Sequence, residues 1–199
     1  MTSERERWVH LHEFGIGHEP GAAAWQALSD QELSRAVQIV DPARRGRFVA
    51  RRSALRAILA TYAGRPVCFN SSDSADVAVV AVAARPVGVD IEIEMSRRPV
   101  ARIAERMFAA DERSALDSSR GDAHQRLFHR CWVAKEAYAK GRGRGLAMRF
   151  ADFSVASALR SPEGTGAVGE GWTVSVSTDR DRHLAVAAEG DDWEVIRVG

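Results

Sequence analysis

Residues 77–94 read VAVVAVAARPVGVDIEIE. The first seven are apolar throughout, which predicts a strand buried on both faces. After Ala84-Arg85-Pro86 the pattern changes to alternation, which predicts a second strand with an apolar face and a polar face. The apolar face carries Val87, Val89, Ile91 and Ile93, and the polar face carries Gly88, Asp90, Glu92 and Glu94. Asp90 and Glu92 thus project from one side, about 6 to 7 Å apart, which suits two carboxylates holding one hard cation. The pair also fits an ordinary solvated strand face.

The residues upstream predict a long helix. Asp41 is a typical N-cap, Pro42 suits the first helical position, and Gly64 ends the helix after about Tyr62. One apolar stripe contains Phe48, Leu55, Leu59 and Tyr62, and six arginines occupy the other faces, at positions 44, 45, 47, 51, 52 and 56. A shorter helix is predicted over residues 29–40, and no regular element is predicted before it.

The residues downstream predict two helices followed by strands. The helices cover residues 100–110 and 122–141, the second with Asp122 as its N-cap, and strands are expected at 172–177, 183–189 and 193–198, after a loop at 161–171. This order predicts an α+β fold made of two similar subdomains, residues 1–96 and 97–199.

The composition excludes several classes of protein. The 28 basic and 27 acidic residues leave a net charge of +1, which argues against nucleic acid or an anionic membrane as the main partner. No signal-like or membrane-spanning apolar run is present, so a cytoplasmic location is expected. Cys68 and Cys131 are expected to be reduced thiols of the core, and His10, His12 and His18 to be surface residues.

The predicted helix ending at Gly141 carries a further polar group. Trp132, Glu136 and Lys140 lie along one of its faces, although a Glu–Lys pair at this spacing is also an ordinary stabilising pair. The next residues, Gly141–Leu146 (GRGRGL), combine glycines that permit close backbone approach with arginines that suit an anion. Mg²⁺ binds carboxylates together with substrate phosphate oxygens, so these patterns together indicate diphosphate chemistry.

These residues resemble a paired family signature. Residues 88–92 (GVDIE), followed by 132–140 (WVAKEAYAK) and 143–146 (GRGL), are similar to the Sfp-type 4'-phosphopantetheinyl transferase superfamily. The resemblance extends to residues 69–74 (FNSSDS) and to the arginine-rich helix. It implies a monomeric pseudo-dimer of two α/β halves, with coenzyme A in the cleft between them.

The resemblance also implies roles for individual residues. Asp90, Glu92 and Glu136 match the Mg²⁺-binding acids, and Lys140 matches a lysine that contacts the phosphates. The implied reaction moves the phosphopantetheine arm of coenzyme A to a serine of an apo acyl or peptidyl carrier protein and releases 3',5'-ADP, with Glu136 as the candidate base. Arg102 and Arg106, with Met107 and Phe108, are candidates for the carrier-binding surface, although Phe108 fits the core better.

The nucleotide half of the implied site departs from the family pattern. Arg44, Arg47, Arg56 and Ser72 match expected phosphate contacts, and a solvated basic face is the alternative for the arginine helix. Arg65 with Pro66 resembles part of a Gly-Lys-Pro motif, and Arg65 is a further candidate for contact with coenzyme A. Asp73 stands where the family usually has histidine and brings a negative charge toward a phosphate. Three interpretations follow: arginines compensate for Asp73 in an active transferase, the donor is another molecule such as dephospho-coenzyme A, or the protein is a non-catalytic binding module.

Overall fold

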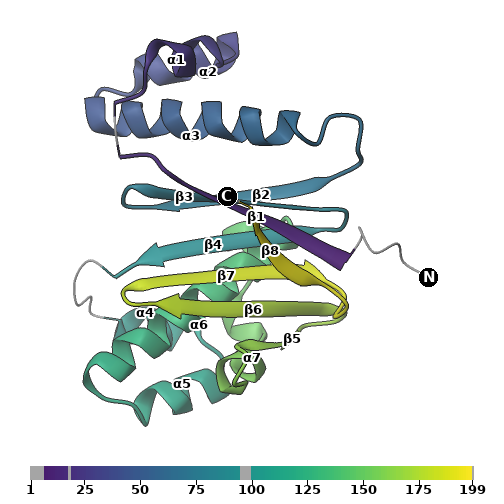
Figure 1. Ribbon diagram of the computed structural model, residues 1–199. Coiled ribbons are helices and arrows are strands. Elements are labelled where there is room, and N and C mark those ends of the chain that lie inside the picture. Colours follow the sequence, from purple (N-terminus) through teal and green to yellow (C-terminus); the bar gives the residue numbers. More distant parts are fainter. Residues whose placement is uncertain (1–6, 18, 95–99, 199) are drawn as a thin grey trace.

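The computed structural model describes residues 7–17, 19–94 and 100–198, which form two β-sheets between two layers of helices (Figure 1). The first sheet has the order β2 (Cys68–Ser74), β3 (Val77–Ala83), β1 (Trp8–Gly15), β8 (Glu194–Val198). The second has the order β4 (Val87–Ile93), β7 (Arg182–Glu189), β6 (Trp172–Asp179), β5 (Thr165–Val168). All neighbouring strands are antiparallel except β1 and β8. The expected α+β class is confirmed, and each sheet is backed by one long helix.

The first helical layer contains α1 (Ala22–Gln26), α2 (Asp30–Gln38) and α3 (Pro42–Ala60). Helix α3 begins as predicted, because the Asp41 carboxylate accepts the backbone N–H of Arg44 at 2.7 Å. Ser29 is the N-cap of α2, and its side chain and that of Glu32 form a capping box. Leu55 and Tyr62 pack against β3 and hold this layer on the first sheet.

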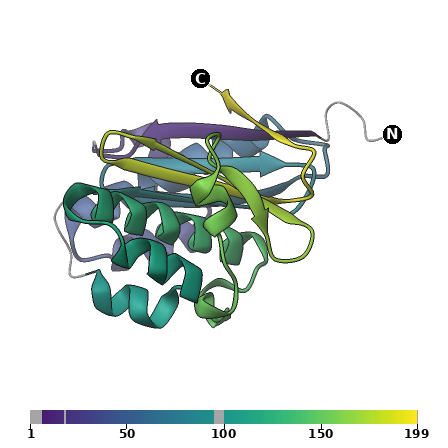
Figure 2. The ribbon, with the colours of Figure 1, turned by 90° about the horizontal axis from the view of Figure 1, so that it is seen from below.

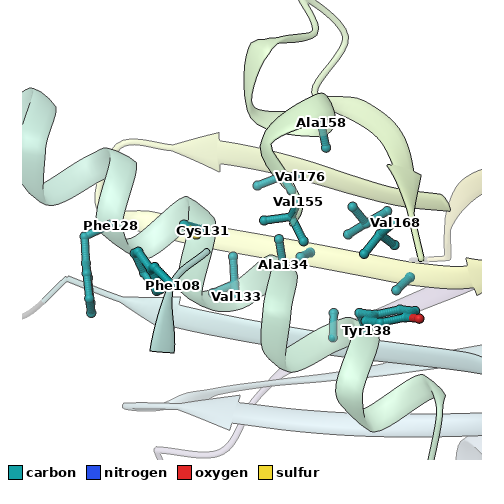
Figure 3. Close-up of a cluster of buried hydrophobic side chains, with 14 of the residues drawn as sticks. Phe108, Phe128, Cys131, Val133, Ala134, Tyr138, Val155, Ala158, Val168 and Val176 are labelled. Atoms are coloured by element: carbon teal, nitrogen blue, oxygen red, sulfur yellow. The ribbon is translucent and has the colours of Figure 1, made fainter. Parts of the chain in front are cut away.

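The second helical layer covers the face of the second sheet that is turned away from α3, as Figure 2 shows from below. It contains α4 (Ala101–Met107), α5 (Ala110–Asp117), α6 (Gly121–Gly141), α7 (Ala156–Arg160) and two 3₁₀ turns, η2 (Gly145–Ala147) and η3 (Phe150–Asp152). Figure 3 shows Val133 and Ala134 of α6 within the buried cluster that also contains Val176 of β6. The predicted N-cap of α6 is wrong: Asp122 lies in the first turn, and Arg120 occupies the cap position without a side-chain hydrogen bond.

A third apolar core lies between the two sheets. The residues of β4 in this core belong to the face that the alternating sequence predicted to be apolar. Val87, Val89 and Ile91 of β4 pack there with apolar residues of β1, β3 and β7. Asp90 points the other way, toward α6, and is only 5% exposed. The alternative of a solvated strand face is therefore wrong for Asp90, because α6 covers that face.

Several elements were not anticipated. Strands β1, β2 and β5 and the short helices α1 and α5 lie in segments that had been expected to be irregular or had no predicted element.

Cys68 is exposed, which corrects its placement in the core, whereas Cys131 is buried, and both are free thiols. His10 and His12 each contact the Tyr62 hydroxyl at 2.8 Å, while His18 lies outside the described residues.

Backbone pairing crosses the predicted boundary at residues 96–97. Strand β4 precedes the boundary but pairs with β7, and β8 follows it but pairs with β1. Each predicted half thus contributes one strand to the sheet of the other half. The boundary between the two subdomains stays a prediction. Within the described ranges, no helix has both the length and the apolar character needed to cross a bilayer.

Candidate active site

Asp90 of β4 and Lys140 of α6 form the centre of the candidate site. The Lys140 ammonium donates to Asp90 Oδ1 at 2.7 Å, to Ser72 Oγ at 2.9 Å and to the Val89 carbonyl at 3.4 Å. The Ser72 hydroxyl in turn donates to Asp90 Oδ1 at 2.7 Å. The structure therefore brings together a serine, an aspartate and a lysine that the sequence placed in three separate segments.

Two glycines allow α6 to approach β4 closely enough for these contacts. A β-carbon on Gly88 would lie 2.0 Å from the Ala137 carbonyl oxygen and 2.4 Å from the Gly141 nitrogen. Distances below 3.0 Å cannot be accommodated without movement of the backbone. Glycine at residue 88 thus sets the spacing at which Lys140 reaches Asp90.

The carboxylate of Glu136 is half-buried and faces the acids of β4. Burial raises its pKa, the negative charges of Asp90 and Glu92 raise it further, and the Lys140 ammonium partly opposes these effects. Burial also raises the pKa of Asp90, against the lowering effects of Lys140 and Ser72. Three carboxylates and one ammonium therefore share a small, partly desolvated region in which negative charge is in excess.

The donor chemistry of this region fits a hard divalent cation. Mg²⁺ prefers oxygen ligands, and the repulsion that raises the pKa of Glu136 is of the kind that a bound cation offsets. Within residues 7–17, 19–94 and 100–198, however, no three Asp, Glu, His or Cys side chains are arranged as a ready-made metal site. One oxygen of Asp90 is paired with the Lys140 ammonium in this arrangement.

A basic pocket lies on the opposite side of β2 from the acids. It has a volume of about 360 Å³ and is lined by Arg35, Ile39, Arg44, Arg47, Phe48, Arg51 and Asp73. Arg44, Arg47 and Asp73 were expected near a nucleotide, and the structure groups them here. Sequence reasoning missed Arg35 and Arg51, although Arg44, Arg47 and Arg51 are spaced for one face of α3.

Two of the arginines predicted to contact the nucleotide do not reach this pocket. Arg56 donates from Nε to Glu32 Oε2 at 2.8 Å, and Arg52 donates to the other oxygen of the same carboxylate at 2.6 Å. Arg65 follows the far end of α3 and lines a different cavity with Trp8 and Tyr62. Helical rotation turns Arg56 toward α2, and the length of α3 separates Arg65 from the pocket, so neither is grouped with Arg44 and Arg47, and their contact with a nucleotide stays a prediction.

Asp73 forms an ion pair with Arg51 at the edge of the basic pocket. Because side chains alternate along β2, Asp73 faces α3, whereas Ser72 and Ser74 on either side of it face β4. The negative charge of Asp73, where the family usually has histidine, is therefore offset by Arg51. This ion pair lies on the face of β2 opposite the one that meets Asp90.

Comparison with known proteins gives one consistent family. A family model described as the 4'-phosphopantetheinyl transferase superfamily matches residues 86–192, more than half of the chain. The chain is 29% identical over 192 residues to the 4'-phosphopantetheinyl transferase HetI of a Nostoc species, covering 84% of this chain and 81% of that protein. It is 30% identical over 152 residues to the putative 4'-phosphopantetheinyl transferase slr0495 of a Synechocystis species, covering 64% of this chain and 62% of that protein.

A solved structure also aligns with part of the chain. It is a holo-(acyl-carrier-protein) synthase from Bacillus anthracis in complex with CoA (3',5'-ADP), with a TM-score of 0.46 and 22% identity over 53% of this chain and 96% of that one. The family assignment rests on the sequence matches and not on this alignment. By the match over residues 86–192, this chain belongs to the 4'-phosphopantetheinyl transferase superfamily.

Proposed function

We propose that this protein transfers the 4'-phosphopantetheine arm of coenzyme A to a serine of an apo acyl or peptidyl carrier protein and releases 3',5'-ADP. The observation that carries the proposal is the contact between Lys140 and Asp90 at 2.7 Å, with Glu136 beside them and the basic pocket across β2. A cationic pocket next to a group of carboxylates and one lysine suits a substrate with several phosphates.

Each part of the site has a role in this proposal. The guanidinium groups of the basic pocket bind the phosphates of the nucleotide, and Lys140 binds the diphosphate. Asp90, Glu92 and Glu136 would hold Mg²⁺, which when bound neutralises charge on the diphosphate oxygens. Arg56 and Arg65 are left out of this proposal, because Arg56 pairs with Glu32 and Arg65 lines a separate cavity.

The reaction is a displacement at phosphorus. The hydroxyl oxygen of the carrier serine bonds to the β-phosphorus of coenzyme A, and the bond from that phosphorus to the bridging oxygen breaks. The bridging oxygen leaves with 3',5'-ADP, and the serine proton passes to Glu136. Glu136 lies beside Asp90 and Lys140 at the centre of the candidate site, which supports it as the base.

The Arg51–Asp73 ion pair supports coenzyme A as the donor. With its charge offset by Arg51, Asp73 does not repel a 3'-phosphate as an isolated carboxylate would. The arginines around Asp73 also suit the 3'-phosphate of coenzyme A, a group that dephospho-coenzyme A lacks. Dephospho-coenzyme A is therefore the less favoured donor.

The proposal includes a monomeric, cytoplasmic enzyme. One chain supplies the whole site, because residues before the boundary contribute Arg44 and Asp90 and residues after it contribute Glu136 and Lys140. No second copy is needed to complete it.

Mass spectrometry tests the proposal directly. Apo acyl and peptidyl carrier proteins are incubated with the protein, Mg²⁺ and either coenzyme A or dephospho-coenzyme A. We expect a mass gain of one phosphopantetheine with coenzyme A, and loss of that gain when EDTA removes the metal. No gain on any carrier would contradict the proposed activity, and a gain with dephospho-coenzyme A alone would overturn the choice of donor.

A further inference from the structure

Hydrogen bonds from side chains connect strands β2 and β4, which do not pair through their backbones. Each strand is the outer member of its own sheet, and the two are not paired with each other in either sheet. Side chains of β2 nevertheless contact β4 along its length: the Asn70 side-chain oxygen accepts the Val89 N–H at 3.3 Å, and Ser74 Oγ accepts the Ile93 N–H at 3.0 Å. Polar side chains thus satisfy N–H groups at an edge that faces another sheet instead of water.

Two serines of β2 meet the two acids of β4 in register. Ser72 donates to Asp90 at 2.7 Å and Ser74 donates to Glu92 at 3.2 Å, and in both pairs the residues are 18 positions apart. A constant offset means that the strands run parallel and that Ser-x-Ser lies directly opposite Asp-x-Glu. The two pairs are therefore repeats of one arrangement.

In this arrangement each serine hydroxyl both donates a hydrogen bond and accepts one. A serine hydroxyl has one hydrogen to donate and can also accept. Ser72 donates to Asp90 and accepts from Lys140, while Ser74 donates to Glu92 and accepts from the backbone N–H of Ile93. The Ile93 N–H thereby fixes the direction in which Ser74 offers its own hydrogen to Glu92.

We infer that Ser74 is a positioning residue that orients the Glu92 carboxylate for metal binding without binding the metal itself. The inference rests on the proposed function, in which Glu92 is one of the Mg²⁺-binding acids. A glutamate side chain loses rotamer freedom when it binds a cation, and a hydrogen bond that fixes it beforehand reduces that loss. Groups that hold metal ligands in this way commonly change metal affinity tenfold or more when they are removed.

The competing role for Ser74 is a purely structural clamp between the two sheets. A clamp would change the stability of the protein without changing its affinity for metal. The two roles are separated by measuring both quantities in Ser74→Ala, in Ser74→Thr, which keeps the hydroxyl on a residue that suits a strand, and in Ser71→Ala as the control. Ser71 lies on the same strand but on the opposite face from the two serines that reach β4.

The experiment is calorimetric titration of Mn²⁺ into each protein saturated with coenzyme A, with melting temperatures measured in the absence of metal. We expect Ser74→Ala to weaken Mn²⁺ binding about tenfold. Ser74→Thr should restore most of the affinity, and Ser71→Ala should match the wild type. At saturating Mg²⁺ the kcat of Ser74→Ala should recover toward the wild-type value.

The outcomes separate this inference from the proposed function. If the wild type transfers the arm and binds Mn²⁺, and Ser74→Ala binds Mn²⁺ equally tightly, the positioning role is wrong and the proposed function stands. A lower melting temperature with unchanged Mn²⁺ affinity would assign Ser74 to the structural clamp. A wild type that neither transfers the arm nor binds Mn²⁺ would remove the proposed function, and this role with it.

Discussion

Gly88 of β4 lies against Gly141 at the C-terminal end of α6, so closely that a β-carbon on Gly88 would be 2.4 Å from the Gly141 nitrogen and 2.0 Å from the Ala137 carbonyl oxygen. The adjacent residues on the two elements are Val89 and Lys140, and the Lys140 ammonium reaches the Val89 carbonyl and the carboxylate of Asp90. Close packing of the two backbones thus determines the geometry of the lysine.

Gly88→Ala should therefore impair both folding and activity. The added methyl group meets backbone atoms of α6, so the helix must move away from β4, at a cost of about 1 to 3 kcal/mol in the free energy of unfolding. The same movement withdraws Lys140 from Asp90. Urea denaturation and the carrier assay measure the two effects, with Gly21→Ala as the control because a β-carbon there has no neighbour within 4 Å. Equal stability of Gly88→Ala and wild type would contradict this account.

Glu136→Gln should abolish transfer while leaving the fold intact. The amide cannot accept the serine proton and is a poorer ligand for Mg²⁺, so a loss of at least about a hundredfold in kcat is expected. The side chain is half-buried and glutamine has nearly the same size and shape, so the melting temperature should change little. Glu94→Gln is the control, since Glu94 follows the Asp-x-Glu motif and contacts His183 instead of the acids. Near wild-type turnover in Glu136→Gln would exclude Glu136 as the base.

The helices and strands that could be predicted from the sequence are those with a clear pattern of apolar residues. Strand β3 and helix α3 were found nearly residue by residue, because each presents an apolar pattern to a core. Strand β2 was not found, because its sequence, CFNSSDS, is polar after Cys68 and Phe69 and shows no alternation of apolar and polar residues. Its partners are the carboxylates of β4 on one face and Arg51 on the other, and none of these is visible from local sequence.

The residues of the candidate site could likewise be predicted only in part. Asp90, Glu136 and Lys140 could be named because they belong to a recognisable signature, and the structure places them together. The fate of Arg56 could not be predicted, because helical periodicity does not reveal which face of α3 meets α2. Glu32 of α2 decides that question by accepting hydrogen bonds from two arginines of α3.

Acid should weaken the attachment of α2 to α3 through Glu32. Burial would raise the pKa of Glu32, but hydrogen bonds from the Ser29 backbone and from Arg56 and Arg52 outweigh it and lower the pKa from 4.5 to about 2. A carboxyl whose pKa is lowered by folding contributes stability above its unfolded-state pKa, and this stability is lost as the pH falls from 4.5 toward 2.

The expected loss over that pH range is on the order of 1 to 2 kcal/mol, since the arginines are partly exposed and screened. Chemical denaturation at a series of pH values measures it. Glu32→Gln should be less stable at neutral pH and should lack this part of the pH dependence, whereas Glu170→Gln, in an exposed turn, should behave as wild type. A pH dependence in Glu32→Gln equal to that of the wild type would show that Glu32 is not the group responsible.

Arg102 and Arg106 of α4 should contribute to carrier binding. Both are exposed and lie one turn apart on the helix, so they present two positive charges on one face. Phe108 is 1% exposed and belongs to the core, which removes it from the candidate surface. Reversing both charges to glutamate should raise the KM for an acidic carrier several-fold and leave the KM for coenzyme A unchanged. Arg160→Glu on α7 is the control, and an equal rise in both KM values would count against this surface.

Arg51 should determine coenzyme A affinity through its ion pair with Asp73. Arg51→Ala removes one positive charge from the basic pocket and leaves the Asp73 carboxylate facing the bound phosphates, so coenzyme A should bind at least about tenfold more weakly, or 1.4 kcal/mol. The double variant Arg51→Ala/Asp73→Ala should recover part of this loss, because the repelling carboxylate is gone as well. Asp73→Ala alone should bind coenzyme A at least as tightly as the wild type, since Arg51 is then available to the ligand.

Isothermal titration with coenzyme A and with dephospho-coenzyme A measures these differences, and Arg65→Ala is the matched control because Arg65 lines a cavity at the other end of α3. If Asp73 serves only to balance Arg51, its removal should leave the affinity for dephospho-coenzyme A unchanged. If Asp73 instead accepts a hydrogen bond from a free ribose hydroxyl, Asp73→Ala should weaken dephospho-coenzyme A selectively, and the preference for coenzyme A as donor would be wrong. Additive effects of the two substitutions on coenzyme A binding would show that the ion pair is not coupled to the nucleotide, because residues that act together give a non-zero interaction energy in such a cycle.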